Sequence, residues 1–122
     1  MRYLILIYSN PASRDIWAGF SEDQRAEGYR YYAALKDELA ASGELVATEA
    51  LADASLTRRV SVRGGQTLTS DGPFAEAKEH LAGFFLLDCA TPERAREIAG
   101  QFAGPGDTVE LRPAMWDDRA DA

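Results

Sequence analysis

The sequence predicts an α+β domain with a ferredoxin-like antiparallel sheet, in which two strand–helix–strand units place their helices on one face. Three observations predict this class. Short apolar runs typical of strands alternate with amphipathic segments typical of helices. Two alternating runs are joined by Gly64-Gly65, which is typical of a β-hairpin inserted between the units. The length of 122 residues fits one hydrophobic core. We therefore expect the order βαβ, inserted hairpin, βαβ.

The first unit begins with residues 3–8, an almost wholly apolar run that predicts a central strand. A helix is predicted to begin after Ser21, because Gln24 follows three residues later and completes a capping-box pattern. Gly43 follows the last turn and suits the left-handed position at which many helices end. Residues 44–50 then predict the second strand of the unit.

The remaining elements are predicted from the same kinds of pattern. The hairpin strands are residues 58–63 and 66–69. Polar and apolar side chains alternate along them, which indicates that one face is partly exposed to solvent. The second unit begins with a buried strand at residues 81–88. A helix follows from Thr91-Pro92 onward, and a final strand covers residues 108–112. Residues 1–116 are thus expected to form a single domain, and residues 117–122 a frayed tail.

Two helices cover only one face of such a sheet, so the other face needs a partner. Val60, Val62, Val109 and Leu111 are expected to leave apolar surface there. The simplest partner is a second copy packed sheet to sheet, which predicts a homodimer in the form of a dimeric α/β barrel.

Composition and charge exclude several classes of partner. A net charge of −7 repels phosphate backbones, so nucleic acid is not an expected partner. The longest apolar runs are far shorter than a membrane span, and nothing resembles a signal sequence, so we expect a cytoplasmic protein without membrane association. Cys89 is the single cysteine and follows an apolar run, which predicts a small buried hydrophobe rather than a nucleophile.

Several segments carry a resemblance to a known family. They are DGPFAEAKE at 71–79 with LAGFF at 81–85, RYLILIY at 2–8, GELV at 43–46, EAL at 49–51 and VELRP at 109–113. These segments resemble the DGPF proteins of the YCII-related family, and the similarity extends to about Pro113. The resemblance implies a dimeric α/β barrel of ferredoxin-like subunits. It also implies a regulatory context, because many members are described only in connection with neighbouring sigma factors.

One departure limits what the resemblance implies. Better-studied YCII relatives are described as using a His–Asp pair, with the His on the first helix eleven residues before a closing Gly. Counting back from Gly43 places Tyr32 at that position, and the single histidine, His80, lies elsewhere. The acid–base mechanism of those relatives is therefore not carried over to this chain.

Asp71, on the Asp-Gly-Pro turn, is the main candidate for chemistry. In one interpretation it is a rigidly held carboxylate that acts as general base or ligand anchor. In the other it caps the turn and accepts backbone N–H groups of Phe74 or Ala75. Tyr32 and Lys78 are expected to assist it as catalytic groups. The sequence leaves both interpretations of Asp71 open.

Tyr8, Arg63 and Glu76 are the expected ligand-binding residues. Tyr8 ends a central strand, where ligands often approach, and Arg63 is a candidate for the pocket wall. The carboxylates around Asp71 have no His or Cys at ligand spacing, so no metal site is predicted. No helix follows Gly64-Gly65, so this pair is not a phosphate loop and no cofactor is expected.

The sequence thus predicts an uncharacterised small-molecule-binding protein with its site between the sheet and residues 71–79. No motif names a substrate or a reaction, so it is left open whether that site is enzymatic. The alternative is a non-catalytic dimeric regulatory or interaction module in a context linked to sigma factors.

Overall fold

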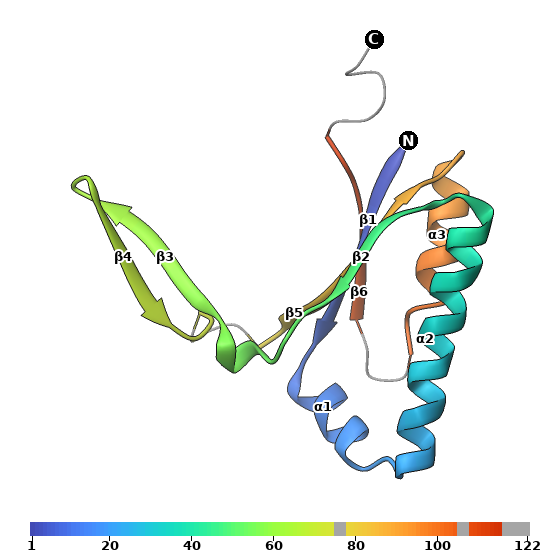
Figure 1. Cartoon of the computed structure of the whole chain (residues 1–122), viewed down its shortest axis with the longest axis horizontal. Helices are drawn as coiled ribbons and strands as arrows, with labels where there is room; N and C mark the ends of the chain where they lie inside the picture. The colour runs from blue at the N-terminus through green and yellow to red at the C-terminus, as the bar shows by residue number, and fades with distance from the viewer. Residues whose placement is uncertain (75–77, 105–107, 116–122) are drawn as a thin grey trace.

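The structure is a computed structural model that describes residues 1–74, 78–104 and 108–115. Its centre is a four-stranded antiparallel sheet with the strand order β2-β5-β1-β6 (Figure 1). These strands are Leu45–Ala50 (β2), His80–Asp88 (β5), Arg2–Ser9 (β1) and Thr108–Pro113 (β6). The α+β class and the antiparallel sheet are confirmed, and the strand order is consistent with a ferredoxin-like sheet.

Two helices pack on one face of this sheet, as predicted. They are α2 (Glu22–Ser42) and α3 (Pro92–Gly100), and both contribute to one core with β1 and β5. The core side chains are Tyr3, Ile5, Leu35, Leu39, Phe85, Leu87, Cys89, Ala95, Ile98, Ala99 and Phe102. The predicted ends of α2 are confirmed, because Ser21 and Gln24 form a capping box and Gly43 adopts a φ of 81°.

The sequence analysis missed one helix, α1 (Pro11–Ala18). It interpreted Asn10-Pro11 only as the end of the first strand, whereas Pro11 is the first residue of the helix. The Asn10 side chain accepts the backbone N–H of Ser13 at 2.8 Å, and the Ser13 hydroxyl accepts the backbone N–H of Asn10 at 2.9 Å. This reciprocal cap fixes the direction in which α1 leaves β1.

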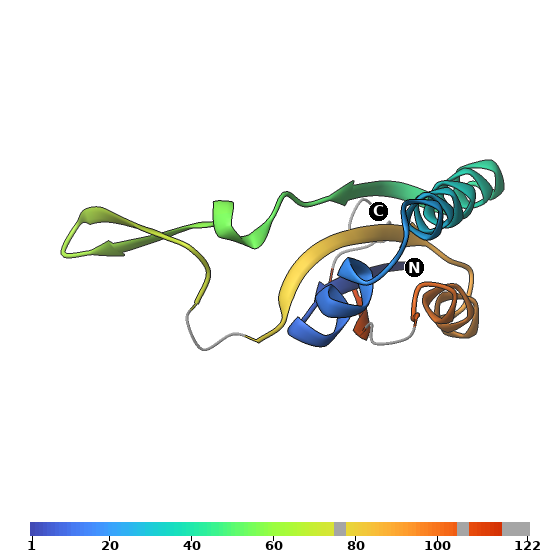
Figure 2. The same ribbon diagram turned by 90° about the horizontal axis from the view of Figure 1, so that it is seen from below.

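The inserted hairpin is confirmed, and it forms a sheet of its own. Strands β3 (Arg58–Arg63) and β4 (Gln66–Asp71) pair only with each other among the described strands, and a short 3-10 turn (η1, Ala54–Leu56) precedes them. Figures 1 and 2 show this hairpin, here called the arm, extending away from the main sheet and its helices. Gly64 and Gly65 both have positive φ, which the tight two-residue turn requires.

The prediction of which residues cover the open face of the main sheet was wrong. Val60 and Val62 lie on the arm, where 63% and 68% of their surfaces are exposed. Val109 and Leu111 pack against the core on the helix side, since they pair with Ile7 and Ile5 of β1. Alternation along a strand gives two faces but does not say which one the helices cover.

Other apolar residues occupy the open face instead. Leu4 and Leu6 of β1 point away from the helices because they alternate with the buried Tyr3 and Ile5. Their cross-strand partners on β5 are Leu86 and Phe84. All four are half-buried. The open face is thus apolar at its centre, as expected, although different side chains make it so.

A bidentate ion pair ties α3 to the end of α2. Arg94 Nε and Nη2 donate to the two carboxylate oxygens of Glu44 at 2.9 and 3.0 Å. Glu44 stands between Gly43 and β2, so this pair fixes α3 beside the connection from α2 to the sheet edge. The Arg94 guanidinium lowers the pKa of the Glu44 carboxyl below its ordinary value of 4.5.

No helix of the described part of the chain is long and apolar enough to cross a membrane.

We predict that Glu44 makes stability depend on pH. A carboxyl whose pKa is lower in the folded state stabilises the fold above its unfolded pKa, and that contribution is lost as the pH falls through the folded pKa. The free-energy difference between wild type and Glu44→Gln should therefore be largest near neutral pH and should shrink below about pH 4.5. Urea unfolding measured from about pH 7 to about pH 3 tests this.

The matched control is Glu97→Gln, since Glu97 accepts a bond from the same Arg94 but is 64% exposed. Its effect on stability should be small at every pH, because exposed ion pairs contribute little. A Glu44→Gln effect that stays the same across the pH range would contradict the prediction.

Candidate functional site

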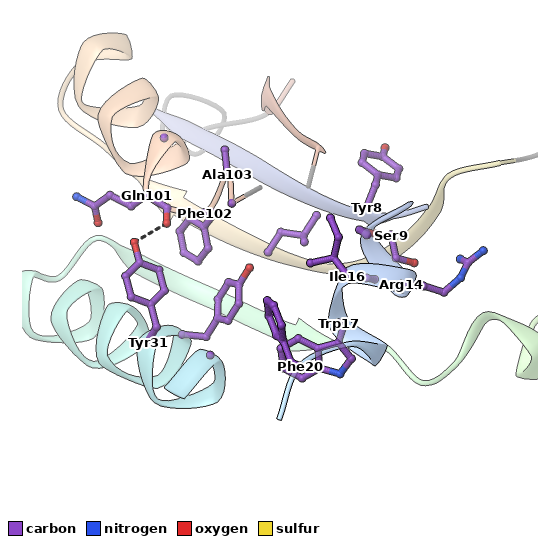
Figure 3. Close-up of a pocket in the computed structure, with 17 residues that line it drawn as sticks. Tyr8, Ser9, Arg14, Ile16, Trp17, Phe20, Tyr31, Gln101, Phe102 and Ala103 are labelled. Atoms are coloured by element: carbon purple, nitrogen blue, oxygen red, sulfur yellow. Dashed lines mark hydrogen bonds between the residues drawn. The ribbon is translucent and has the colours of Figure 1, made fainter. Parts of the chain in front are cut away.

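The main cavity lies between α1, α2, the end of α3 and the ends of β1 and β5. Its volume is about 690 Å³, which is within the range of small-molecule pockets. Figure 3 shows aromatic side chains from three separate parts of the chain converging on it. The aromatic lining residues are Trp17, Phe20, Tyr31, Tyr32 and Phe102, together with Tyr8, whose ring is turned away from the others. Most of the remaining lining is apolar or small.

The wall formed by α1 is held against the start of α2. Arg25 Nε donates to the carbonyl oxygen of Trp17 at 3.2 Å, and Arg25 Nη2 donates to that of Ala18 at 2.9 Å. The Trp17 ring packs edge-on against Tyr29, with ring centroids 5.3 Å apart. It also passes close to Gly28, where an added Cβ would lie 3.1 Å from the ring. Glycine at this position therefore lets the two helices approach.

The opposite wall joins the cavity to the core. Tyr32 stacks on Phe102 with ring centroids 5.8 Å apart and an angle of 27° between the rings. Phe102 is 1% exposed and lies 4.5 Å, centroid to centroid, from Phe85 of β5. The Tyr31 hydroxyl donates to the Gln101 carbonyl oxygen at 2.7 Å, which links α2 to the end of α3. This wall is therefore anchored in the core, whereas the wall formed by α1 rests on a few contacts.

Few polar groups face the main cavity. Ser13 is buried, but its hydroxyl donates to the Asn10 carbonyl and accepts the Asn10 N–H, so it serves as a helix cap. In Figure 3 the Arg14 side chain points away from the aromatic group. Among the described residues that line the cavity there is no Asp, Glu or His. The described lining is therefore suited to holding a mostly apolar molecule.

A second, smaller cavity adjoins the first. Its volume is about 430 Å³, and it lies between α2 and the strands β2 and β5. Ile7, Tyr32 and Ala82 line both cavities. We call it the side cavity. Among its lining residues are Lys36 of α2 and Thr48 of β2.

Of the three residues expected to be catalytic, Tyr32 lies in the main cavity and the other two do not line it. Asp71 is the last residue of β4, its side chain is 84% exposed, and it forms an ion pair with Arg58 at the base of the arm. Lys78 is exposed, in the segment before β5. Ala75, a predicted donor to Asp71, lies outside the described residues. The structure therefore does not bring Asp71 and Tyr32 into one described pocket.

Of the three expected ligand-binding residues, Tyr8 is the one among the described lining residues of the main cavity. Figure 3 shows the Tyr8 ring pointing away from the aromatic group, and the Glu110 carboxylate beside it raises the pKa of the Tyr8 hydroxyl. Arg63 is exposed at the tip of the arm, next to the Gly64-Gly65 turn. Glu76 lies outside the described residues.

A further hollow of about 540 Å³ lies near the predicted position, at the base of the arm. Its lining includes Phe74, Glu79 and His80, with residues of β3, but not Asp71. The Arg59 guanidinium lies over the Phe74 ring, 4.8 Å from its centre. Within residues 1–74, 78–104 and 108–115, no three His, Cys, Asp or Glu side chains are grouped to hold a metal ion.

Sequence reasoning missed the α1 side of the main cavity. The available signal was the Asn-Pro-Ala-Ser start at 10–13, which predicts a capped helix, followed by Trp17 and Phe20. Phe102 was not recognised as a lining residue of the cavity. It lies at the end of the helix predicted for the second unit and was interpreted only as a core residue.

Comparison with known proteins places the chain in a family. The model of the YCII-related domain matches residues 1–105. The chain belongs to the YCII-related family. It is also 30% identical, over 116 residues, to an uncharacterised protein of Rhizobium meliloti (strain 1021), covering 93% of this chain and 91% of that protein. In this family member, Tyr32 forms the boundary between the two cavities.

We predict that Asp71→Asn leaves thermal stability unchanged within error. The change removes the charge that pairs with Arg58, but both side chains are well exposed, at 84% and 63%. Such pairs contribute little in water and are screened by salt. Thermal melts of wild type and variant at low and high salt test this, and a large salt-independent loss would show that the arm base depends on the pair.

Proposed function

We propose that this protein binds a small, flat and mostly apolar molecule in the main cavity. The observation that carries the proposal is a cavity of about 690 Å³ whose lining includes six aromatic residues, from the end of β1, α1, the connection between α1 and α2, α2, and the residues that follow α3. Aromatic walls bury flat ligands efficiently and favour stacked or edge-on ring contacts.

The proposal moves the site from residues 71–79 to the space between α1 and α2. It keeps Tyr8 and Tyr32 from the sequence-based set, with Tyr32 as a wall residue rather than as a partner of Asp71. The distance in sequence between Trp17 and Phe102 explains why local motifs did not indicate this site.

Trp17 supplies the test, as an intrinsic fluorophore in the wall of the cavity. The chain has two tryptophans, so Trp116→Phe leaves Trp17 as the single reporter. Titration with the neutral fluorophore N-phenyl-naphthylamine should quench Trp17 and give saturable binding. Phe20→Ala and Trp17→Ala should each weaken binding about tenfold or more, because each removes aromatic contact area. Binding to Trp17→Ala is measured from the emission of the probe itself.

Two control variants show where the molecule binds. Asp71→Asn and Phe74→Ala alter the base of the arm and should leave affinity unchanged, because neither side chain lines the main cavity. Circular dichroism should show that every variant is folded. If Asp71→Asn abolishes binding while Phe20→Ala does not, the site lies at residues 71–79 and the proposal is wrong.

We also propose that the protein is a homodimer in which a second copy covers the open face. Leu4, Leu6, Phe84 and Leu86 form two cross-strand pairs at the centre of that face. In a single chain they remain partly exposed, since α2 and α3 pack on the other face. A sheet-to-sheet contact between two copies would bury this apolar patch symmetrically.

Leu86→Asp tests the dimer. A charge placed at this position opposes burial between two sheets, and the side chain points away from the helix core, so the fold of the single chain should persist. Sedimentation of the wild type should give twice the chain mass, and that of the variant the chain mass. Val60→Asp, on the exposed arm, is the control and should stay dimeric. A wild type that is monomeric throughout the micromolar range would rule the dimer out.

The arm supports a second candidate function, that of a non-catalytic interaction module. Val60 and Val62 share one face of the arm with Thr67 and Thr69, their cross-strand partners, and both valines are more than 60% exposed. Exposed β-branched residues on a projecting hairpin are typical of a contact surface. This candidate gains weight if no small molecule binds the wild-type protein.

A further inference from the structure

We propose that the ligand is an amphipathic anion, whose flat apolar part fills the main cavity and whose carboxylate binds Lys36 in the side cavity. This inference rests on the proposed function and specifies the class of ligand. Tyr32 then stands between the two halves of the ligand and determines how they are joined.

The two cavities form one groove along α2. They share Ile7, Tyr32 and Ala82, so the boundary between them lies at Tyr32. Tyr29, Tyr32, Ala33 and Lys36 line the side cavity and are spaced at i, i+3, i+4 and i+7 of α2. That spacing places them on one helix face, with Lys36 one turn beyond Tyr32. A ligand in the main cavity that passes Tyr32 therefore reaches Lys36.

The two cavities differ in the placement of their cationic groups. Both have aromatic walls, but Arg14 of the main cavity points away from the aromatic group (Figure 3), whereas Lys36 is the cationic residue among the described lining of the side cavity. Thr48 also lines the side cavity, but its hydroxyl already donates to the Phe84 carbonyl oxygen at 2.8 Å. The ammonium group is thus the main polar group available to a ligand at this end.

Glu49, which also lines the side cavity, does not oppose an anion there. It pairs with Phe84 on the open face, whereas its neighbour Thr48 pairs with Phe85 on the helix face. Because side chains alternate along a strand, the Glu49 carboxylate lies on the face away from α2. Its contribution to the cavity wall is then expected to come from the backbone.

Lys36 lines the side cavity and is itself exposed to solvent. It forms no ion pair within the described residues. The residues three and four positions away on α2 are Tyr32, Ala33, Leu39 and Ala40, none of which is acidic. A chain with a net charge of −7 therefore keeps one lysine without a helical partner beside an apolar groove. The carboxylate group of the ligand would supply the negative charge that pairs with the Lys36 ammonium group.

Matched probes test the proposal, namely naphthalenebutyrate and its primary amide. They share the ring and the chain and differ in charge. By calorimetry, the wild type should bind the carboxylate about tenfold more tightly than the amide, and high salt should reduce that preference. Lys36→Met should remove the preference and leave the affinity for the amide unchanged, since methionine keeps much of the apolar stem.

Lys78→Met is the matched control, because Lys78 is the other lysine of the chain and is exposed far along the sequence, before β5. It should keep the full preference for the carboxylate. In Tyr32→Ala the two cavities should merge, so that naphthaleneacetate, whose chain is shorter, gains affinity relative to the butyrate.

The possible failures are distinguishable. If both probes bind equally and Lys36→Met changes neither, the ligand is not an anion held by Lys36, while the proposed binding function stands. If Lys78→Met rather than Lys36→Met removes the preference, the anion binds near residues 71–79 instead. If neither probe binds the wild type, the proposed function and this inference both fall.

Discussion

The packing of Phe102 is the interaction on which both the core and the candidate site depend. Its ring is almost fully buried and contacts Phe85 of the sheet and Tyr32 of α2. One side chain therefore connects the sheet, both large helices and the wall of the main cavity. Because the interior is close-packed, a substitution that changes the side-chain volume at position 102 would disturb the packing at all of these places. The site is thus partly a continuation of the core, with its shape fixed by the same aromatic contacts that stabilise the fold.

The sequence predicted the elements whose signals are local. The capping box at Ser21, the left-handed Gly43 and the Gly64-Gly65 turn each require specific residues, and all three are found where expected. The helix α1 was missed although its cap is equally local, because Asn10-Pro11 also suits the end of a strand. The residues after a short motif decide between two such interpretations, and Trp17 was not recognised as part of a helix.

Faces and distances were beyond what local patterns contain. Val109 and Leu111 alternate correctly, yet alternation does not say which side the helices occupy. Likewise, the pattern of β3 is the same whether it joins the main sheet or forms a separate arm. Asp71 attracted attention because its motif is compact in sequence, whereas the main cavity combines residues from 17, 32 and 102. Only the tertiary structure brings such residues together, so just two of the residues predicted from the sequence, Tyr8 and Tyr32, line the main cavity.

The two walls of the main cavity differ in how firmly they are held, and this has a consequence for the rate of ligand exchange. The wall at Phe102 belongs to the core, but α1 is only eight residues long and is too short to be stable alone. It depends on its cap, on two hydrogen bonds from Arg25 and on the Trp17 ring. Amide hydrogen exchange should therefore be faster in α1 than in α2, and local opening of this helix would widen the cavity. Changes at Arg25 would then alter association and dissociation rates together, while the equilibrium affinity changes little.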